Sequence, residues 1–298
     1  MCFGKIGDNM KLMIMPKNIE MLKKNIGKYT SIMIGIENLS INMPKYFTYQ
    51  EFLGIYNFAK ENNIEVFVAL NKNMHNKELE YLKETMFKLE ELNIKGIVYY
   101  DVALVNIKLE NNLNTPLVWG QEHLTTNSVT SNFWNNFGSK YTLVSNEITK
   151  EEIIEMKKDS KSELIVTVFG YLPMFVSERH LIKNYLKTFN LSDKSDVNYI
   201  ENDGNIYPII DDELGTIAYS AHVLNGINEV LELKKHGIEY VLLNSFLIED
   251  DDFSFVLDLF NNVDEENVSE YSKQIEEKFK CDNGFLNKET IYKVKKND

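Results

Sequence analysis

Eight short apolar runs, each followed by a longer segment with helical periodicity, constrain this chain more than any other feature. The runs are almost continuously apolar, which is typical of parallel strands buried on both faces of a sheet. They span Lys11–Pro16, Ser31–Glu37, Ile64–Asn71, Ile94–Asp101, Pro116–Gln121, Lys140–Asn146, Glu163–Gly170 and Ile238–Ser245. Eight such units in 298 residues predict an α/β fold, a (β/α)8 barrel of the TIM type. Periodicity does not show closure, so an open sheet stays as the alternative.

The segments between the runs carry the start and stop signals of helices. Thr149 followed by Glu152 forms a capping box, and Gly237 stands where the C-terminal cap of a helix is expected. The predicted helices span Asn18–Ile26, Thr48–Asn62, Lys77–Leu92, Val102–Asn111, Val129–Phe137, Thr149–Asp159, Asn225–His236 and Asp252–Asn262.

The alternation breaks after the seventh run. A short helix over Leu181–Thr188 is followed by two hairpin-turn signals, Asn202–Gly204 and Glu213–Gly215. We therefore expect a β-hairpin ribbon at 197–224 inserted into a barrel that spans 11–262. Residues 263–298 are expected to form a C-terminal extension that packs on the barrel. Long insertions on barrel loops cover or shape the ligand mouth.

The composition excludes several kinds of site. The net charge of −13 gives no overall electrostatic attraction for nucleic acid, so an RNA contact needs a local basic patch or a basic partner. Cys2 and Cys281 are the only cysteines, so the chain alone builds neither an iron–sulfur nor a zinc–thiolate site, and we expect no cofactor. No run is long enough to span a membrane and no secretory signal is evident, which predicts a cytoplasmic protein.

Polar residues gather just after the predicted strands, where the carboxyl ends of barrel strands carry the functional groups of TIM-barrel enzymes. As catalytic candidates we take His123, Glu147, Glu178 and His180; as substrate-binding candidates Glu37, Asp101, Gln121, Asn127, Ser145 and Arg179. Carboxylates and imidazoles are the usual general acids and bases, and amides read hydrogen-bonding groups. No GxSxG, HExxH or P-loop string is present, so a serine triad has no support.

Arg179 is the only arginine in the chain. Its guanidinium offers a rigid fork of donors that matches a carboxylate or a phosphate, which the point charge of lysine does not reproduce. An ordinary salt bridge with Glu178 or another neighbouring acid remains the structural alternative.

Structural roles are also open for the other candidates. Glu147 precedes the capping Thr149 and favours a helix N-terminus, and Asp101 is placed to cap the helix that follows it. A metal site made of His123, His180 and Glu147 is conceivable, but it has no spacing signature, and we assign no metal ligands.

Several stretches, taken in order, resemble the collagenase-like peptidases of family U32 over about Lys11 to Val294. They are NSVTSNFWNNFG, YTLVSNEITKEEI, ELIVTVFGYLPMFVSERHLIKNY, DELGTIAYSAHVLNGINEVLELKKHGIEYVLLN and GFLNKETIYKV. The resemblance implies a TIM barrel and a peptidase (hydrolase) activity. It also implies a role in hydroxylation, because members of the family act in quinone or RNA hydroxylation, including prephenate-linked hydroxylation of the tRNA wobble uridine, often as two paralogues.

Carried over by position, Gln121, Asn127 and Ser128 match the loop after the fifth strand of the family, and Ser145 and Glu147 match the sixth. Gly170 opens the family's signature loop.

This sequence departs from the family at several polar positions. The signature loop holds Pro173, Ser177 and His180 in place of cysteines. Asn146 stands where arginine is common, and Leu242 and Asn244 stand where an arginine and an acid are expected. Much of the family's polar site is therefore missing, and catalysis by this chain itself is in doubt.

Three functions remain open. The chain is a barrel subunit that reaches tRNA through a longer, cysteine-bearing paralogue as a hetero-oligomer, or a peptidase acting on unfolded, collagen-like peptides, or a module that binds a small anion through Arg179.

Overall fold

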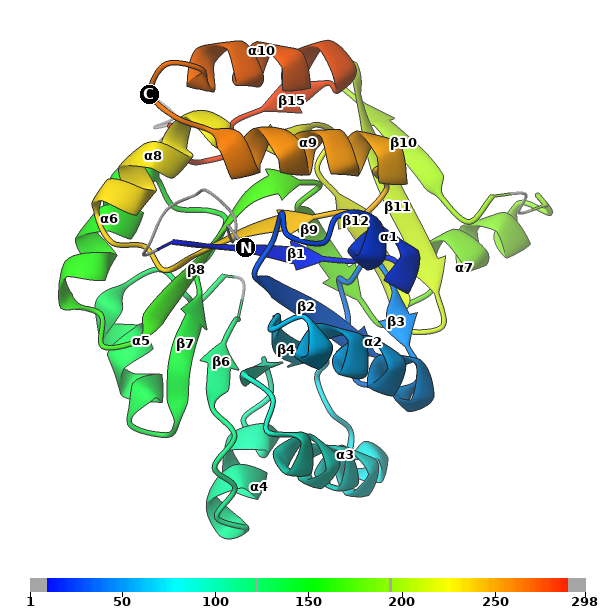
Figure 1. Ribbon diagram of the computed structural model, residues 1–298. Coiled ribbons are helices and arrows are strands. Elements are labelled where there is room, and N and C mark those ends of the chain that lie inside the picture. The colour runs from blue at the N-terminus through cyan, green and yellow to red at the C-terminus, as the bar shows by residue number, and fades with distance from the viewer. Residues whose placement is uncertain (1–9, 122, 193–194, 289–298) are drawn as a thin grey trace, which may run out of the picture.

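The computed structural model describes residues 10–121, 123–192 and 195–288. Eight parallel strands form a closed barrel, because β14 pairs with β8 on one side and with β1 on the other (Figure 1). The barrel strands, in their order around the barrel, are β1 (Lys11–Met15), β2 (Ser31–Ile36), β4 (Glu65–Leu70), β5 (Gly96–Tyr99), β6 (Leu117–Trp119), β7 (Ser139–Leu143), β8 (Glu163–Gly170) and β14 (Tyr240–Asn244). Seven lie within the predicted runs, and β7 begins one residue before its run, so the TIM-barrel prediction is confirmed and the open sheet is wrong.

The barrel interior is filled by alternate side chains of its strands. Met13, Phe67, Tyr141 and Tyr240 are buried there, and the ring of Phe67 meets Tyr141 at 5.1 Å and Tyr240 at 5.6 Å, edge to face. The opposite side chains of the same strands pack against the helices. Burial on both faces explains why the strands are apolar without alternation. The barrel is therefore a packed core and not a pore.

Helices follow the strands where the sequence predicts them. They are α1 (Ile19–Lys24), α2 (Tyr49–Glu61), α3 (Leu79–Leu92) with a short 3-10 turn η1 (Asn76–Glu78) before it, α4 (Ala103–Glu110), α5 (Ser128–Asn135), α6 (Lys150–Asp159), α8 (Ile227–Lys235) and α9 (Asp250–Asn262). The capping box of Thr149 and Glu152 is formed at the start of α6. Gly237, at φ +79°, follows the end of α8.

The insertion after β8 is a four-stranded antiparallel sheet with a helix, and it extends away from the barrel (Figure 1). It contains β9 (Pro173–Ser177), α7 (Leu181–Thr188), β10 (Asn198–Asn202), β11 (Asn205–Asp212) and β12 (Gly215–Tyr219). We call residues 173–219 the arm. Both predicted turns join neighbouring strands of this sheet. The sheet begins at Pro173, before the ribbon expected from 197, because β9 pairs with β12.

The chain after α9 contains a helix and a strand that the sequence does not predict. Helix α10 (Val268–Lys278) contacts α8, and β15 (Cys281–Asp282) pairs with β13 (Val223–Asn225), which itself pairs antiparallel with β8. This segment therefore lies beside the start of the arm. Cys2 and residues 289–298 lie outside the described residues. In the described part of the chain, no helix is both long and apolar enough to cross a membrane.

Candidate functional site

The mouth of the barrel, at the carboxyl ends of the strands, is nearly filled. Met15, Met33 and Leu242 lie under a cavity of about 50 Å³, and the amides of Asn71 and Asn244 line its walls. Ligand pockets measure roughly 300–1,000 Å³. No charged side chain of the described residues lines this cavity. As lined by the described residues, this cavity therefore has neither the room nor the charged groups of a catalytic pocket.

The backbone that covers the mouth is fixed by one glycine. Gly170 ends β8 at φ +118°, and a Cβ at this position would lie 2.5 Å from the backbone oxygen of Asn244. Only glycine tolerates both this φ and this approach. From Gly170 the chain crosses the mouth, where Tyr171, Leu172 and Pro173 line the cavity from above.

A larger cavity, which we call the side cavity, opens beside the mouth and has a volume of about 650 Å³. Its walls come from the loop after β7, the start of the arm and the segment around β15. They are formed by Asn146, Glu147, Leu172, Pro173, Met174, Asn205, Tyr207, Ser220, Ala221, His222, Cys281, Asp282, Gly284, Phe285 and Lys288. Its size and mixed lining are those of a small-molecule site.

Two histidine–carboxylate pairs belong to this region. His222 Nδ1 lies 3.2 Å from Asp282 Oδ2, and the buried His222 Nε2 has no hydrogen-bond partner among the described residues. His123 Nδ1 lies 3.2 Å from Glu147 Oε1, with both side chains more than half exposed. A carboxylate on one ring nitrogen orients the other as donor or acceptor, as in acid–base sites.

Cys281 is a poor nucleophile in this cavity. Burial raises the pKa of its thiol to about 12, and the nearby carboxylates of Glu276 and Asp282 act in the same direction. The thiolate, which is the reactive form, is therefore scarce at neutral pH.

The candidates of the signature loop lie in the arm and not at the mouth. His180 Nδ1 lies 2.8 Å from Asp211 Oδ1, and the other oxygen of Asp211 accepts the backbone N–H groups of Ile182 and Lys183 at the start of α7. Burial tends to raise the pKa of Asp211, but these N–H groups and His180 outweigh it and hold the pKa below its usual value. His180 thus helps to anchor α7 on the sheet.

Glu178 and Arg179 are exposed at the start of the arm helix. Glu178 lies 3.1 Å from His75 Nε2, which links the arm to the connection between β4 and α3. The Arg179 side chain has no hydrogen bond or ion pair with the described residues, so the salt bridge weighed as its structural role is not formed within the described part of the chain.

The binding candidates on the other loops mostly hold local structure. Asp101 accepts the N–H groups of Met74 and Ala103, Asn127 caps α5 through the N–H of Thr130, and buried Ser145 accepts the N–H of Glu147. Glu37 is exposed beside a cavity of about 340 Å³ under the arm. The backbone oxygen of Gln121 accepts a hydrogen bond from the Thr125 hydroxyl.

The structure brings together only part of the predicted set. His123 and Glu147 form a pair, but His180 lies with Asp211, so the three-residue metal site considered from the sequence does not assemble. Within the described ranges, no group of three His, Cys, Asp or Glu side chains is arranged to hold a metal. Sequence reasoning missed His222 and Asp282, which are 60 residues apart and meet only because β15 pairs with β13.

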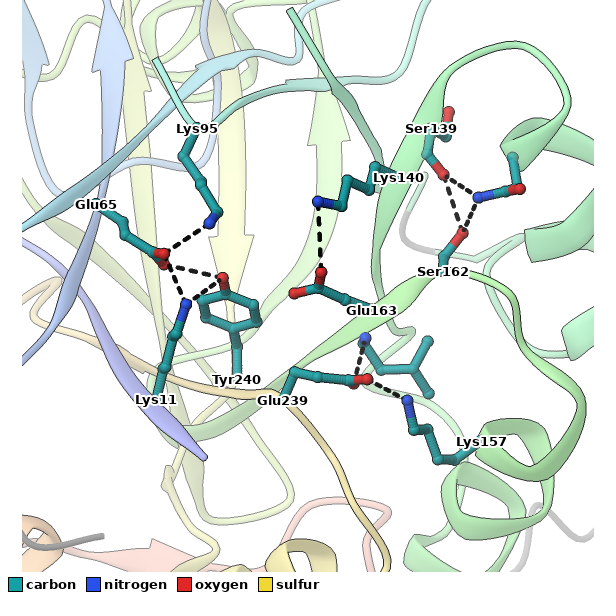
Figure 2. A network of polar contacts seen from close by, with 12 residues as sticks. Lys11, Glu65, Lys95, Ser139, Lys140, Lys157, Ser162, Glu163, Glu239 and Tyr240 are labelled. Atoms are coloured by element: carbon teal, nitrogen blue, oxygen red, sulfur yellow. Dashed lines mark hydrogen bonds and ion pairs between the residues drawn. The ribbon is translucent and has the colours of Figure 1, made fainter. Parts of the chain in front are cut away.

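The amino end of the barrel carries a network of charged and polar side chains (Figure 2). Glu65 accepts hydrogen bonds from Lys11 at 2.6 Å, Lys95 at 2.7 Å and the Tyr240 hydroxyl at 2.9 Å. Burial tends to raise the pKa of Glu65, yet these donors outweigh it and the pKa is lowered. This network therefore lies at the end of the barrel that contributes stability in TIM-barrel proteins.

Comparisons with known proteins identify the family of the chain. The profile of peptidase family U32 matches residues 18–290. The chain is 26% identical to tRNA hydroxylation protein P2 of Bacillus subtilis (strain 168), over 88% of this chain and 92% of that protein. It is 23% identical to tRNA hydroxylation protein P1 of the same organism, over 80% of this chain and 60% of that protein.

Among solved structures, the U32 peptidase Mk0906 is similar in fold, with a TM-score of 0.53 and 13% identity over 82% of this chain and 96% of that one. Because the family profile covers most of the sequence, the chain belongs to peptidase family U32.

Proposed function

We propose that this chain is a barrel subunit that acts with a longer paralogue in the hydroxylation of the tRNA wobble uridine. The observation that carries the proposal is the nearly end-to-end match to tRNA hydroxylation protein P2. The second match, to a protein P1 of which the chain spans 60%, supports a longer partner from the same family. Such a protein works in the cytoplasm, where tRNA is modified.

The filled mouth supports a division of labour between the two subunits. This chain has no cysteines in its signature loop and no charged side chain among the described residues that line the mouth cavity. In this proposal the partner therefore carries out the hydroxylation. The net charge of −13 likewise assigns most of the tRNA contact to the partner.

In this proposal the side cavity is the part of the chain that faces substrate. Glu147 and its partner His123 stand at its edge, and His222, whose buried Nε2 has no hydrogen-bond partner among the described residues, lines it. Of the other candidates, Arg179 and Glu178 would act from the arm, and Gln121 from the loop beside His123. Hydrogen bonds that hold local structure explain the presence of four further candidates, Asp101, Asn127, Ser145 and His180. Glu37 would act only through the cavity under the arm.

The test is nucleoside mass spectrometry of bulk tRNA from a deletion strain without a second copy of the gene. We expect the hydroxylated wobble nucleoside to disappear and to return with a plasmid copy. Unchanged nucleosides in the deletion strain would overturn the proposal. A plasmid copy with His222→Phe, which keeps a ring but removes both nitrogens, tests whether the side cavity takes part.

A peptidase is the second candidate, because the family carries that name. The chain is also 24% identical to the uncharacterized protease MJ0090 of Methanocaldococcus jannaschii, over 52% of this chain and 39% of that protein. Purified protein that cleaves gelatin, with the activity lost in His123→Ala, would favour this function.

A module that binds a small anion is the third candidate, and it is tested by thermal shift. A ligand at a hundredfold excess over its Kd stabilises the folded protein by about 2.7 kcal/mol.

A further inference from the structure

Exposed large apolar side chains concentrate on the arm. Among the described residues, ten of the twenty such side chains lie within residues 174–206. They are Met174, Phe175, Val176, Leu181, Tyr185, Phe189, Leu191, Tyr199, Ile200 and Ile206. Soluble monomers rarely expose apolar side chains in such density, and patches of this kind mark interaction sites.

Helix α7 leaves one apolar side uncovered by the rest of the arm. None of its residues is buried, and its first turn is anchored through polar bonds to Asp211. Leu181, Tyr185 and Phe189 recur every four residues and so share one side of the helix, where the rings of Tyr185 and Phe189 lie 4.8 Å apart. Half-buried Ile182 and Leu186 occupy a different side. The apolar stripe is therefore available to another molecule.

Cations gather along the same segment. Lys183 and Lys187 lie one turn apart on α7, and Arg179 stands just before the helix. No acid occurs from 179 to 191, although the whole chain has a net charge of −13. Lys183 donates to the backbone oxygen of Asp212 and lies 3.8 Å from the carboxylate of Asp211, whereas the Arg179 side chain has no partner among the described residues. A planar guanidinium is suited to bidentate contact with a carboxylate.

We propose that the arm, through α7 and the adjoining strands, binds a different protein whose docking face is apolar and bordered by carboxylates. A second copy of this chain is disfavoured, because two chains of charge −13 repel each other and α7 has no acid to meet the cations of its own copy. RNA is disfavoured, because six of the ten exposed side chains are aliphatic and offer no ring for stacking.

This inference rests on the proposed function, in which the partner is the paralogous U32 protein. The first test places a photo-crosslinking amino acid at Phe189 in the full chain, in its own cells. We expect one crosslinked polypeptide, identified by mass spectrometry as the U32 paralogue. Crosslinks to a second copy, crosslinks removed by ribonuclease, or no crosslink at all would each overturn the proposal.

The second test measures association of the purified chain with the purified paralogue. Tyr185→Asp with Phe189→Asp should weaken binding about a hundredfold, as loss of apolar anchors does. Arg179→Glu should weaken it about tenfold, less so at high salt. The matched control is Val129→Asp, an equally drastic change at a 78% exposed residue of α5, which should leave binding unchanged. Equal affinity of the arm variant and wild type, or equal loss in the control, would contradict the proposal.

The two failures are distinguishable. If the arm binds the paralogue but tRNA nucleosides do not depend on this chain, the proposed function is wrong and the docking surface stands. If nucleosides depend on the chain but the arm variants bind normally, the docking surface is wrong.

Discussion

In a barrel enzyme the reacting polar groups lie at the carboxyl ends of the strands. In this barrel the charged network lies at the amino end instead. At the amino end, one partly buried carboxylate, Glu65, collects Lys11, Lys95 and the hydroxyl of Tyr240. At the carboxyl end, where barrel enzymes place their reacting groups, thioethers, leucine and amides surround about 50 Å³. Charge stabilises one end and apolar packing closes the other. The contacts with other molecules are therefore expected on the side cavity and the arm.

Gly170→Ala should have the largest effect on stability, because the added methyl group would clash with the backbone that closes the mouth. A methyl group at φ +118° and 2.5 Å from the Asn244 oxygen is expected to destabilise the fold by about 3 kcal/mol. Chemical denaturation measures this loss. The control is Gly27→Ala, at φ +85° with no atom within 4 Å, which should cost about 1 kcal/mol. Equal losses in both variants would show that the close approach at the mouth does not matter.

Glu65→Gln should have the next largest effect, because it leaves Lys11 and Lys95 without their shared carboxylate. We expect a loss of about 2 kcal/mol in the free energy of unfolding. Glu163→Gln is the control at the same end, since its pair with Lys140 spans 3.7 Å and should contribute less than about 0.5 kcal/mol. If the two variants were equally stable, the network would not stabilise the amino end.

The contribution of Glu65 should depend on pH. Its pKa is lower in the folded state than the unfolded value of about 4.3. Its stabilisation is therefore present above about pH 4.3 and is lost as the pH falls through the lower folded pKa. Denaturation of wild type and Glu65→Gln should differ most near neutral pH and converge in acid. A difference that grows on acidification would contradict the lowered pKa.

Thr167→Val should have the smallest effect. The side chain lines the mouth cavity, and a change of nearly equal shape at a place without chemistry should alter stability by less than about 0.5 kcal/mol. Thermal unfolding and the tRNA nucleoside profile should both match wild type. A lost nucleoside with unchanged stability would reveal a function at the mouth.

The barrel was predictable because its strands are buried on both faces, which leaves almost continuously apolar runs such as Glu163–Gly170. The site was less predictable. His180 follows the seventh strand in sequence, but β9 carries it into the arm, where it meets Asp211. His222 and Asp282 approach through the pairing of β13 with β15, and a two-residue strand leaves no periodic signal. Asp101 and Asn127 follow strands because helices begin there, and their side chains bond to the first turns.

The most direct test of the account compares the mouth with the arm in one assay. A deletion strain is complemented with wild type, Thr167→Val, or Tyr185→Asp combined with Phe189→Asp, and tRNA nucleosides are measured by mass spectrometry. The account predicts that wild type and the mouth variant restore the hydroxylated wobble nucleoside, while the arm variant, folded and present at the same level, does not. Restoration by the arm variant, or failure of a stably folded mouth variant, would contradict it.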